Sequence, residues 1–541
     1  MEKIVENIKK RYSKAKTGTE TFFSMYKRAY ELCAPNYNNT QRGAYHGQTG
    51  QPNVSDSTVS RAADAFVNTF VSTICPPQTR WMELAPSDDL VKMVAVQSVA
   101  EGGGDFETMP VDEQKQLLQD IQESLSQEYQ KITDAFFVAL NQSNFYSVID
   151  QFSHDVFVGT GCLLVQHSGD YFDSASPLDF TAIPPLDIAV ELSPQQKITG
   201  VFRKQKLRKS QVEYTFPGFN MSVLEDGNVI DNDCEIEVLE ACIIDPQFIK
   251  AENGMTQFVR WHYMVIYNDK IAFDTRLEEN PFIVFFWSLR HGENVGRGLL
   301  TKLLPDAEEL EVLTRTKIKW LQMNAMGIYT VVTSMVPNPA MVEIRPNSVI
   351  PVLEQGAIQP LQPSGNPQIE QMHIQELQQA IKETALDFTI PNDPRMTATQ
   401  VQYIAQRQLQ IFAGVVGRIQ FQFLWKIVQN CLNILIRVGA IEIPPELGKI
   451  DPRTTKLKIL SPIGRVQFMN DLNSLNTALG TIAQVDPMLI QQYVRTEDLP
   501  TYVFEQTGAP AKLLRSREET DQVKQEMAQQ QQEAMMMAQA K

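Results

Sequence analysis

The stretch 391–438 constrains the fold of this chain more than any other. Pro391 and Pro394 stand at its start, and a helix cannot run through them because proline lacks the backbone N–H and clashes with the preceding turn. Thr397 and Gln400 then have the spacing of a capping box, in which each side chain satisfies a free N–H of the first turn. The apolar residues that follow recur at helical spacing, and they predict one helix of about forty residues, about 60 Å long.

Two apolar rows run along this predicted helix. The first contains Val401, Ile404, Phe412, Val415, Ile419, Phe423, Ile427, Cys431, Ile434 and Val438, and the second contains Val416, Leu424, Val428, Leu432 and Leu435. Gly414 and Gly417 are the expected bend points. Two rows indicate burial on more than one side, which suits packing against copies of the same chain. An ordinary core helix of a large helical protein has the same periodicity, so both interpretations stay open.

Composition limits the class of protein. The chain has 541 residues, 43% hydrophobic and 21% charged, which is enough for two to four domains with sizeable cores. Its net charge of −16 argues against a protein that grips nucleic acid over a broad surface, because that surface needs clustered Lys and Arg. It does not exclude a protein that DNA passes without sticking. Six cysteines without a CxxC pair favour reduced, structural thiols in a cytosolic setting, and we expect no secretory leader and no membrane-spanning helix.

Helices dominate the first part of the chain. Apolar spacing predicts an amphipathic helix over 1–35, whose apolar side carries Ile4, Ile8, Phe22, Tyr26 and Tyr30. Further elements are expected as helices over 56–73, 113–143 and 145–158, a short strand over 78–86, and loops over 36–55 and the Gly-rich acidic segment 100–112.

Residues 165–290 change to alternating and β-branched runs, which predict a mostly antiparallel β region. One basic cluster lies within it and consists of Arg203, Lys204, Lys206, Arg208 and Lys209. Lysines often protect the solvated edge of a strand from mispairing, and this structural interpretation is favoured over a nucleic-acid contact.

Two helices are expected to flank a small β unit. The first should begin at Pro305, because proline is welcome in a first turn, and the second at the pair Asn366-Pro367. Short strands over 328–363 form the unit between them and are expected to pair with neighbouring subunits. Residues 439–515 are expected to form loops and shorter helices, and the tail from Ser516 is low in complexity and either frayed or helical.

Catalytic motifs are missing from the sequence. There is no GxxxxGK[ST] loop, no GxSxG elbow and no HExxH pair, and the six histidines lack a cysteine partner at metal spacing. Ser153, His154 and Asp155 are adjacent on a predicted helix, so their side chains point in different directions and cannot form a catalytic relay. We therefore expect no catalytic residues, no metal, no cofactor and no enzyme.

The order of these elements resembles the portal, or head-to-tail connector, protein of short-tailed bacteriophages (podoviruses). The similarity spans roughly residues 20–515. The segments that carry it are PPQTRWMELAPS (76–87), NSNFYSVIDQFSHDVFVGTGCLLV (142–165), ENVGRGLLTKLLPDAEELEVL (293–313) and RMTATQVQYIAQRQLQ (395–410). These are packing and turn signatures rather than catalytic ones, and segment 100–112 has no place in the family pattern.

The resemblance implies an α+β portal-protein fold assembled as a dodecameric ring at one capsid vertex. The parts it implies are an α/β wing (1–303), a first stem helix (304–327), a small β clip (328–363), a second stem helix (364–388), a tunnel loop (389–396), a long spine helix (397–438), a helical crown (439–515) and a C-terminal barrel or disordered tail (516–541). The ring would be the channel for DNA packaging and ejection.

The resemblance also implies partners and a location. The partners are other copies of the chain, the major capsid and scaffolding proteins, the large terminase subunit, the tail adaptor or tail tube protein, internal core proteins in some members, and double-stranded DNA passing without sequence readout; no membrane is involved. The ring would belong to the virion, after assembly in the host cytoplasm. Asn392, Asp393 and Arg395 of the tunnel loop are the candidate DNA contacts. A hydrolase with a dispersed acidic site and a structural ring without DNA remain the alternatives.

Overall fold

The computed structural model describes residues 2–34, 54–77, 79–101, 106, 109–168, 176–222, 233–250, 256–326, 329–331, 358–360, 367–385, 414–415, 417–442, 454–460, 475, 477–482, 484, 494, 499 and 503. The chain divides into two compact units. The first unit contains Met1–Val71, Val138–Ile404 and Gly417–Glu442, and the second contains Ser72–Phe137, Ala405–Val416 and Ile443–Lys541.

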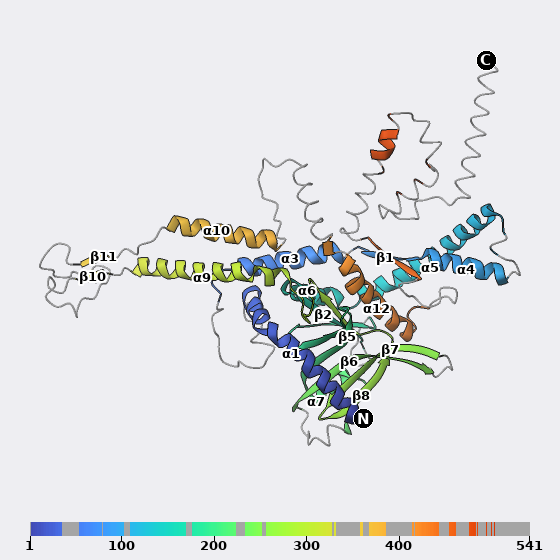
Figure 1. The fold of residues 1–541 in the computed structure, drawn as a ribbon, viewed down its shortest axis with the longest axis horizontal. Coiled ribbons are helices and arrows are strands. Elements are labelled where there is room, and N and C mark those ends of the chain that lie inside the picture. Colours follow the sequence, from blue (N-terminus) through green and yellow to red (C-terminus); the bar gives the residue numbers. More distant parts are fainter. Residues whose placement is uncertain are drawn as a thin grey trace, which may run out of the picture. The chain divides into compact units, whose positions relative to one another are not determined.

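The first unit contains a five-stranded antiparallel sheet (Figure 1), with strand order β4-β5-β6-β7-β8. The strands are β4 (Ile188–Leu192), β5 (Ile198–Arg208), β6 (Glu235–Lys250), β7 (Thr256–Tyr267) and β8 (Lys270–Leu277). Each strand pairs with its neighbour in sequence. Asn268 and Asp269 join β7 to β8 with φ values of 45° and 65°, because a two-residue hairpin turn needs positive φ at both positions.

A smaller antiparallel sheet packs against one face of the first. Its order is β3-β2-β9, with β3 at Leu178–Ile183, β2 at Thr160–His167 and β9 at Phe282–Phe286. Both sheets contribute to one apolar core, which includes Cys162, Ile183, Val201, Val238 and Val265. All strand pairs described between 160 and 290 are antiparallel, so the predicted antiparallel β region is confirmed.

Helix α1 (Glu2–Cys33) covers the other face of the large sheet. Ile8 packs there with Phe202 and Met264, while Tyr26 and Tyr30 are buried further along the helix. The predicted apolar side is therefore correct for these three α1 residues. Ile4, at 47% exposure, lies outside the core.

Aromatic side chains join α3 (Thr58–Ile74) to α6 (Phe145–Val158) and to the segment after β9. The ring of Phe66 lies 5.1 Å from that of Phe157 and 5.6 Å from that of Trp287. Helix α6 has the bounds that the sequence predicted, because Gly159 follows its last residue directly. A short helix, α7 (Lys209–Thr215), follows β5 and adds Val212 to the core between the sheets.

Two antiparallel helices, α9 (Leu299–Met326) and α10 (Pro367–Thr384), lie side by side in the same unit (Figure 1). The short strands β10 (Tyr329–Val331) and β11 (Ile358–Pro360) follow α9 and precede α10, and they pair with each other. These two strands therefore pair within one chain, whereas the sequence predicted pairing with neighbouring subunits; the rest of 328–363 lies outside the described residues.

The predicted start of α9 at Pro305 is wrong, because the helix begins at Leu299 and contains Pro305 in its second turn. A proline inside a helix costs about 3 kcal/mol, since one hydrogen bond is lost and the ring crowds the preceding turn. Leu300 and Leu303 are both buried in this early turn, and each contributes about 1.5–3 kcal/mol. Their burial offsets the cost of the proline.

The described part of the predicted spine helix is not a regular α-helix. It contains a π-helical turn, η3 (Ile419–Leu424), followed by α12 (Trp425–Val438), which ends at Gly439 in the left-handed region. Most of its apolar residues are buried within the same chain, and Phe423 stacks on Phe152 at 4.5 Å between ring centroids, whereas Phe421 (65%) and Val438 (44%) are exposed. The described part favours the core-helix interpretation over packing against copies; residues 397–413 and 416 lie outside the described residues.

The second unit pairs strand β1 (Met82–Pro86) with β12 (Thr455–Ile459). Helix α4 (Asp88–Glu101) follows β1, and most of α5 (Val111–Asn141) belongs to this unit. Trp81 packs edge-on against Phe136 and Phe137. Strand β12 and helix α4 were not predicted, although Thr455, Leu457 and Ile459 alternate with two lysines, as a half-buried strand does.

Across both units, none of the helices in the described ranges combines the length and the apolar character needed to span a bilayer.

Candidate functional site

The antiparallel helix pair α9/α10 is the element that stands out as a candidate functional site. Leu310 of α9 and Ile374, Leu377 and Ile381 of α10 are buried, so an apolar seam runs along the pair. The Lys317 ammonium donates a hydrogen bond to Gln371 Oε1 across the pair. The two helices therefore form one packed body.

A histidine adds a second polar link across the pair. His373 Nε2 of α10 lies 3.0 Å from Glu309 Oε1 of α9, and its Nδ1 lies 3.6 Å from Glu376 Oε2. The hydrogen bond to Glu309 raises the pKa of His373 above its ordinary value, and Glu376 adds to this. The site is solvent-exposed, so we expect the link to contribute little to stability.

Apolar side chains also lie on the outside of the pair. Val312 is 63% exposed, Ile369 is 64% exposed and Met372 is 62% exposed. Val312 follows the buried Leu310 by two positions, which on a helix places it on the opposite side. The pair has an apolar seam inside and a second set of apolar side chains that nothing in the described chain covers. These side chains are therefore candidates for a contact with another protein.

The base of the pair is fixed by a buried carboxylate. Glu311 of α9 is 3% exposed, and its oxygens accept hydrogen bonds from the backbone N–H groups of Ser55 and Asp56. Arg315 Nη2 donates to the same carboxylate at 2.9 Å. Asp56 in turn accepts a hydrogen bond from Gln378 Nε2 of α10 at 2.9 Å. The chain segment before α3 is therefore held by both helices of the pair.

A glycine junction lies where α6 meets β2 and where the chain enters α9. A Cβ added to Gly159 would lie less than 3.0 Å from the carbonyl oxygen of Gly296, and one added to Gly296 would lie equally close to that of Gly159. Gly298 has the same relation to the backbone of Phe157 and Val158. The junction brings together two of the segments, 142–165 and 293–313, that carry the family resemblance.

Polar bonds close this junction. The hydroxyl of Thr160 accepts a hydrogen bond from the N–H of Gly296 at 2.8 Å, and Tyr26 of α1 donates to the Gly296 carbonyl. Burial raises the pKa of the Tyr26 hydroxyl well above its usual range, so Tyr26 stays neutral. The junction is a packed structural contact, with no room for a ligand between the two backbones.

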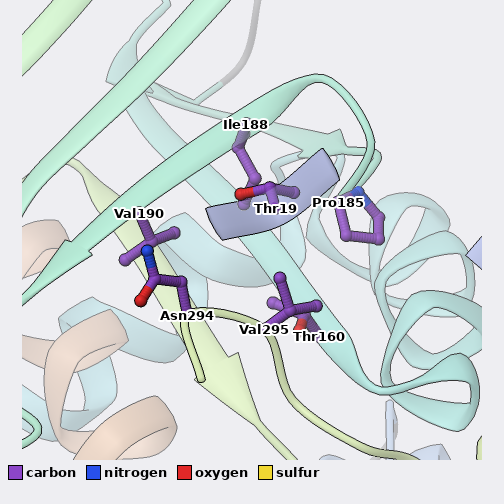
Figure 2. Close-up of a pocket in the computed structure, with 7 residues that line it drawn as sticks. All are labelled: Thr19, Thr160, Pro185, Ile188, Val190, Asn294 and Val295. Carbon is purple, nitrogen blue, oxygen red and sulfur yellow. The ribbon is translucent and has the colours of Figure 1, made fainter. Parts of the chain in front are cut away.

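A small cavity lies beside this junction. Figure 2 shows Thr19 of α1, Thr160 of β2, Ile188 and Val190 of β4, and the loop residues Pro185, Asn294 and Val295 around it. Its volume is about 10 Å³, which is room for a single water molecule, whereas sites for organic ligands span about 300–1,000 Å³. Within the described ranges, no three His, Cys, Asp or Glu side chains are grouped to hold a metal ion. This cavity is therefore too small for a cofactor.

The predicted basic cluster lies on β5 and at the start of α7, where acidic residues of β6 partner part of it. Arg203 Nη1 lies 3.4 Å from the buried carboxylate of Glu240, and Lys204 Nζ lies 2.6 Å from Glu237. In the register of the sheet, Lys206 stands opposite Glu237, and Arg208 opposite Glu235. Two of the five cations, Arg203 and Lys204, are thus paired with carboxylates of β6.

The cluster is also not on a simple edge strand. Strand β5 lies between β4 and β6, and β4 pairs with it as far as Arg203. Beyond Arg203, the described strands pair with β5 only on the β6 side. Lys209 continues into α7. The expected edge protection therefore applies to the part from Lys204 onward. The other predicted site residues, Asn392, Asp393 and Arg395, lie outside the described residues.

Ser153, His154 and Asp155 point apart, as the sequence predicted. The Ser153 hydroxyl donates to the carbonyl of Ile149, and Tyr30 donates to Asp155 Oδ1 at 2.6 Å. Burial raises the pKa of Asp155 well above its usual range, which opposes a role for this carboxylate as an anion.

The sequence did not predict the role of the residues at the base of the helix pair. Glu311 has the appearance of an ordinary charged residue in an acidic run, and Asp56 that of a residue near a helix start. Of the two, only Asp56 has a local signal in the sequence, because an Asp just before a helix often accepts a backbone N–H of the first turn. In the structure its Oδ1 accepts the Thr58 N–H at 2.7 Å.

One comparison with known proteins gives a match. A family model described as bacteriophage head to tail connecting protein matches residues 5–514. No curated protein matches the chain. The matched range covers nearly the whole sequence and includes the helix pair, the glycine junction and both sheets.

Proposed function

Because the chain belongs to the family of bacteriophage head to tail connecting proteins, we propose that it forms a ring at one capsid vertex and acts as the channel for packaging and ejecting DNA. Membership of this family makes the chain a structural component of the virion at the junction of capsid and tail. The family is structural rather than enzymatic, which removes the support for the hydrolase alternative.

The observation that carries the ring is the exposed apolar surface of the helix pair. Val312 lies on the outside of α9, and Ile369 and Met372 lie on the outside of α10, each more than 60% exposed. His373 lies beside Glu309 and Lys317 beside Gln371, so Val312 and Met372 lie at similar heights along the pair. In a ring of parallel copies, α9 of one copy would face α10 of the next at matching height. Val312 would then pack against Ile369 and Met372 of its neighbour.

We assign the parts of the portal fold to this chain from its family and from the order of its elements. The wing would contain the two sheets and the helices that cover them. The stem would be α9 and α10, so that it begins at Leu299 rather than at residue 304. The clip would be 328–363, which contains β10 and β11. The tunnel loop at 389–396, the spine at 397–438, the crown at 439–515 and the tail from 516 follow in sequence. A dodecamer is the stoichiometry that the family resemblance implies.

Charge supports a channel that DNA passes without readout. The chain carries a net charge of −16, and an acidic lumen repels the phosphate backbone. Sequence readout needs side chains aimed at base edges, which a ring around a duplex does not require. We propose the large terminase subunit and later the tail adaptor as partners of the clip, and the capsid and scaffolding proteins as partners of the wing.

Native mass spectrometry and negative-stain microscopy of the purified full-length chain test this proposal. We expect closed rings with a central channel wide enough for duplex DNA. A protein that stays monomeric or dimeric at micromolar concentration, with and without scaffolding protein, would overturn it. A ring with a channel narrower than a duplex would favour the structural ring without DNA.

A further inference from the structure

A short segment before α3 joins the helix pair to the remainder of the first unit. Ser55 and Asp56 lie against both α9 and α10, since Glu311 of α9 accepts their backbone N–H groups and Gln378 of α10 donates to the Asp56 side chain. The same segment leads into α3, whose Phe66 packs in the aromatic core with Phe157. One segment therefore contacts the base of both helices and continues into the core.

The position of Glu311 along α9 is informative. Ala307, Leu310 and Glu311 are buried, and from Val312 to residue 322 every α9 residue is half-buried or exposed. Glu311 is thus the last buried residue of α9 in this range, at the point where the helix leaves the body of the unit. A buried carboxylate is costly unless hydrogen bonds satisfy it, and here backbone N–H groups and Arg315 do so.

Asp56 makes two different contacts with its two oxygens. Oδ1 accepts the N–H of Thr58 at 2.7 Å and so fixes the first turn of α3. Oδ2 accepts from Gln378 Nε2 at 2.9 Å and so fixes α10. A residue that only capped a helix would use the first contact alone. The second contact ties the start of α3 to the helix pair.

We propose that Ser55, Asp56, Glu311 and Gln378 form a latch that sets the angle of the helix pair relative to the core of the first unit. Glu311 and Asp56 are its positioning residues. The latch consists of hydrogen bonds rather than apolar packing, so breaking it loosens the contact between the pair and the segment before α3, while buried Leu300 and Leu303 still hold the first turns of α9. The consequence for a connector, a stem held at a fixed angle in the ring, rests on the proposed function, whereas the latch is a property of the folded chain.

Hydrogen exchange of the full-length chain, measured by mass spectrometry without DNA, tests the latch. The variant Glu311→Gln keeps the side-chain shape but replaces one carboxylate oxygen with an NH₂ group. This group cannot accept the hydrogen bonds that Ser55, Asp56 and Arg315 donate. We expect exchange at Ser55 and Asp56 to be faster by about tenfold or more, because each lost hydrogen bond to a charged group is worth at least that factor. Exchange in α6 and β2 should stay as in the wild type.

Matched variants separate the latch from a general loss of stability. Glu308→Gln makes the same change at an exposed site three residues earlier, where only an exposed contact with Arg28 is lost, and should leave exchange unchanged. Asp56→Asn should also be mild, because the Gln378 amide can turn to accept from the new donor, whereas Asp56→Ala should resemble Glu311→Gln.

Two results would overturn the latch. One is unchanged exchange at Ser55 and Asp56 in Glu311→Gln, and the other is a loss of protection that spreads equally through α6 and β2. Failure of ring formation affects neither measurement, so the proposed function and the latch can fail separately.

Discussion

Gly159 and Gly296 face each other so closely that neither has room for a side chain. A Cβ on either residue would lie less than 3.0 Å from the other's carbonyl oxygen. The obstacle is backbone on both sides, so it cannot turn away as a flexible side chain would. The junction joins the end of α6 to the segment that enters α9, and thus connects the aromatic core with the helix pair.

Gly296→Ala and Gly159→Ala should each lower the free energy of unfolding by about 1–3 kcal/mol or more, because overpacking forces the backbone to shift. Urea unfolding followed by circular dichroism measures this. Gly417→Ala is the matched control, since nothing lies within 4 Å of a Cβ at Gly417 and alanine favours a helix. Equal stability of Gly296→Ala and Gly417→Ala would contradict the close contact.

The sequence predicted elements whose signals are local. Helix α6 has its expected bounds because Gly159 marks its end, and α10 begins at the expected Pro367. Strand β12 was missed because five residues pair with β1, more than 350 positions earlier, and no local pattern announces that partner. The start of α9 was misplaced because burial of Leu300 and Leu303 outweighs the local rule for proline.

The candidate site was less predictable than the fold. The exposed apolar residues of the helix pair are part of a helical pattern that gives no indication of which side meets a partner. Glu311 acquires its role only when Ser55, distant in sequence, is brought against it. Whether Arg395 faces a channel depends on how copies of the chain assemble. The periodicity of one chain does not determine that assembly.

Asp155 should make stability depend on pH. Burial raises its pKa above the value of about 3.9 in an unfolded chain, and the neighbouring Asp187 adds to this. The folded state therefore holds the proton more tightly. The resulting stability is complete below the unfolded pKa and is lost as pH rises through the folded pKa. Over that window the free energy of unfolding should fall by up to about 1.4 kcal/mol per pH unit.

Asp155→Asn should remove this part of the pH dependence, since the amide carries no titrating proton. Urea unfolding at several pH values between 4 and 9, on wild type and variant, provides the comparison. Tyr30→Phe is the companion variant, because it removes the hydroxyl that donates to Asp155 and should destabilise the chain most at high pH. Parallel pH curves for wild type and Asp155→Asn would show that Asp155 does not control the effect.

Val312→Glu and Met372→Glu should block ring assembly while leaving the folded chain intact. Both side chains are exposed in the single chain, so a charge costs little there, but an unpaired charge in a packed interface costs about 3–5 kcal/mol. Native mass spectrometry should show monomers in place of rings, with circular dichroism unchanged. Met93→Glu, on the equally exposed Met93 of α4, is the control; loss of rings there too would mean that added charge alone prevents assembly.

Replacing residues 332–357 by a short Gly/Ser linker should remove docking of partners but keep the helix pair. The β10–β11 ladder, which includes the pair Val331 and Ile358, stays in this variant and holds the ends of α9 and α10 together. Binding of terminase and tail adaptor, measured by sedimentation with assembled rings, should be lost. Wild-type binding by this variant would assign docking to another part of the chain.

Arg395→Ala should weaken retention of packaged DNA without affecting the ring. Arg395 is the only cation and Asp393 the only anion in the proposed tunnel loop 389–396, so one Arg per copy would provide a circle of weak phosphate contacts. Such contacts are screened by salt, so the difference from wild type should shrink as ionic strength rises. DNA retained in particles after packaging, measured across a salt series, reports the effect.

Two further variants serve as controls. Asp393→Asn tests whether positive charge in the loop is what holds DNA, because a loop without the anion should retain DNA at least as well as wild type. Lys92→Ala on α4 is the control for loss of a cation elsewhere. Rings that fail to assemble in Arg395→Ala would make the loop structural. Normal retention at every salt concentration would leave Arg395 without a role in holding DNA.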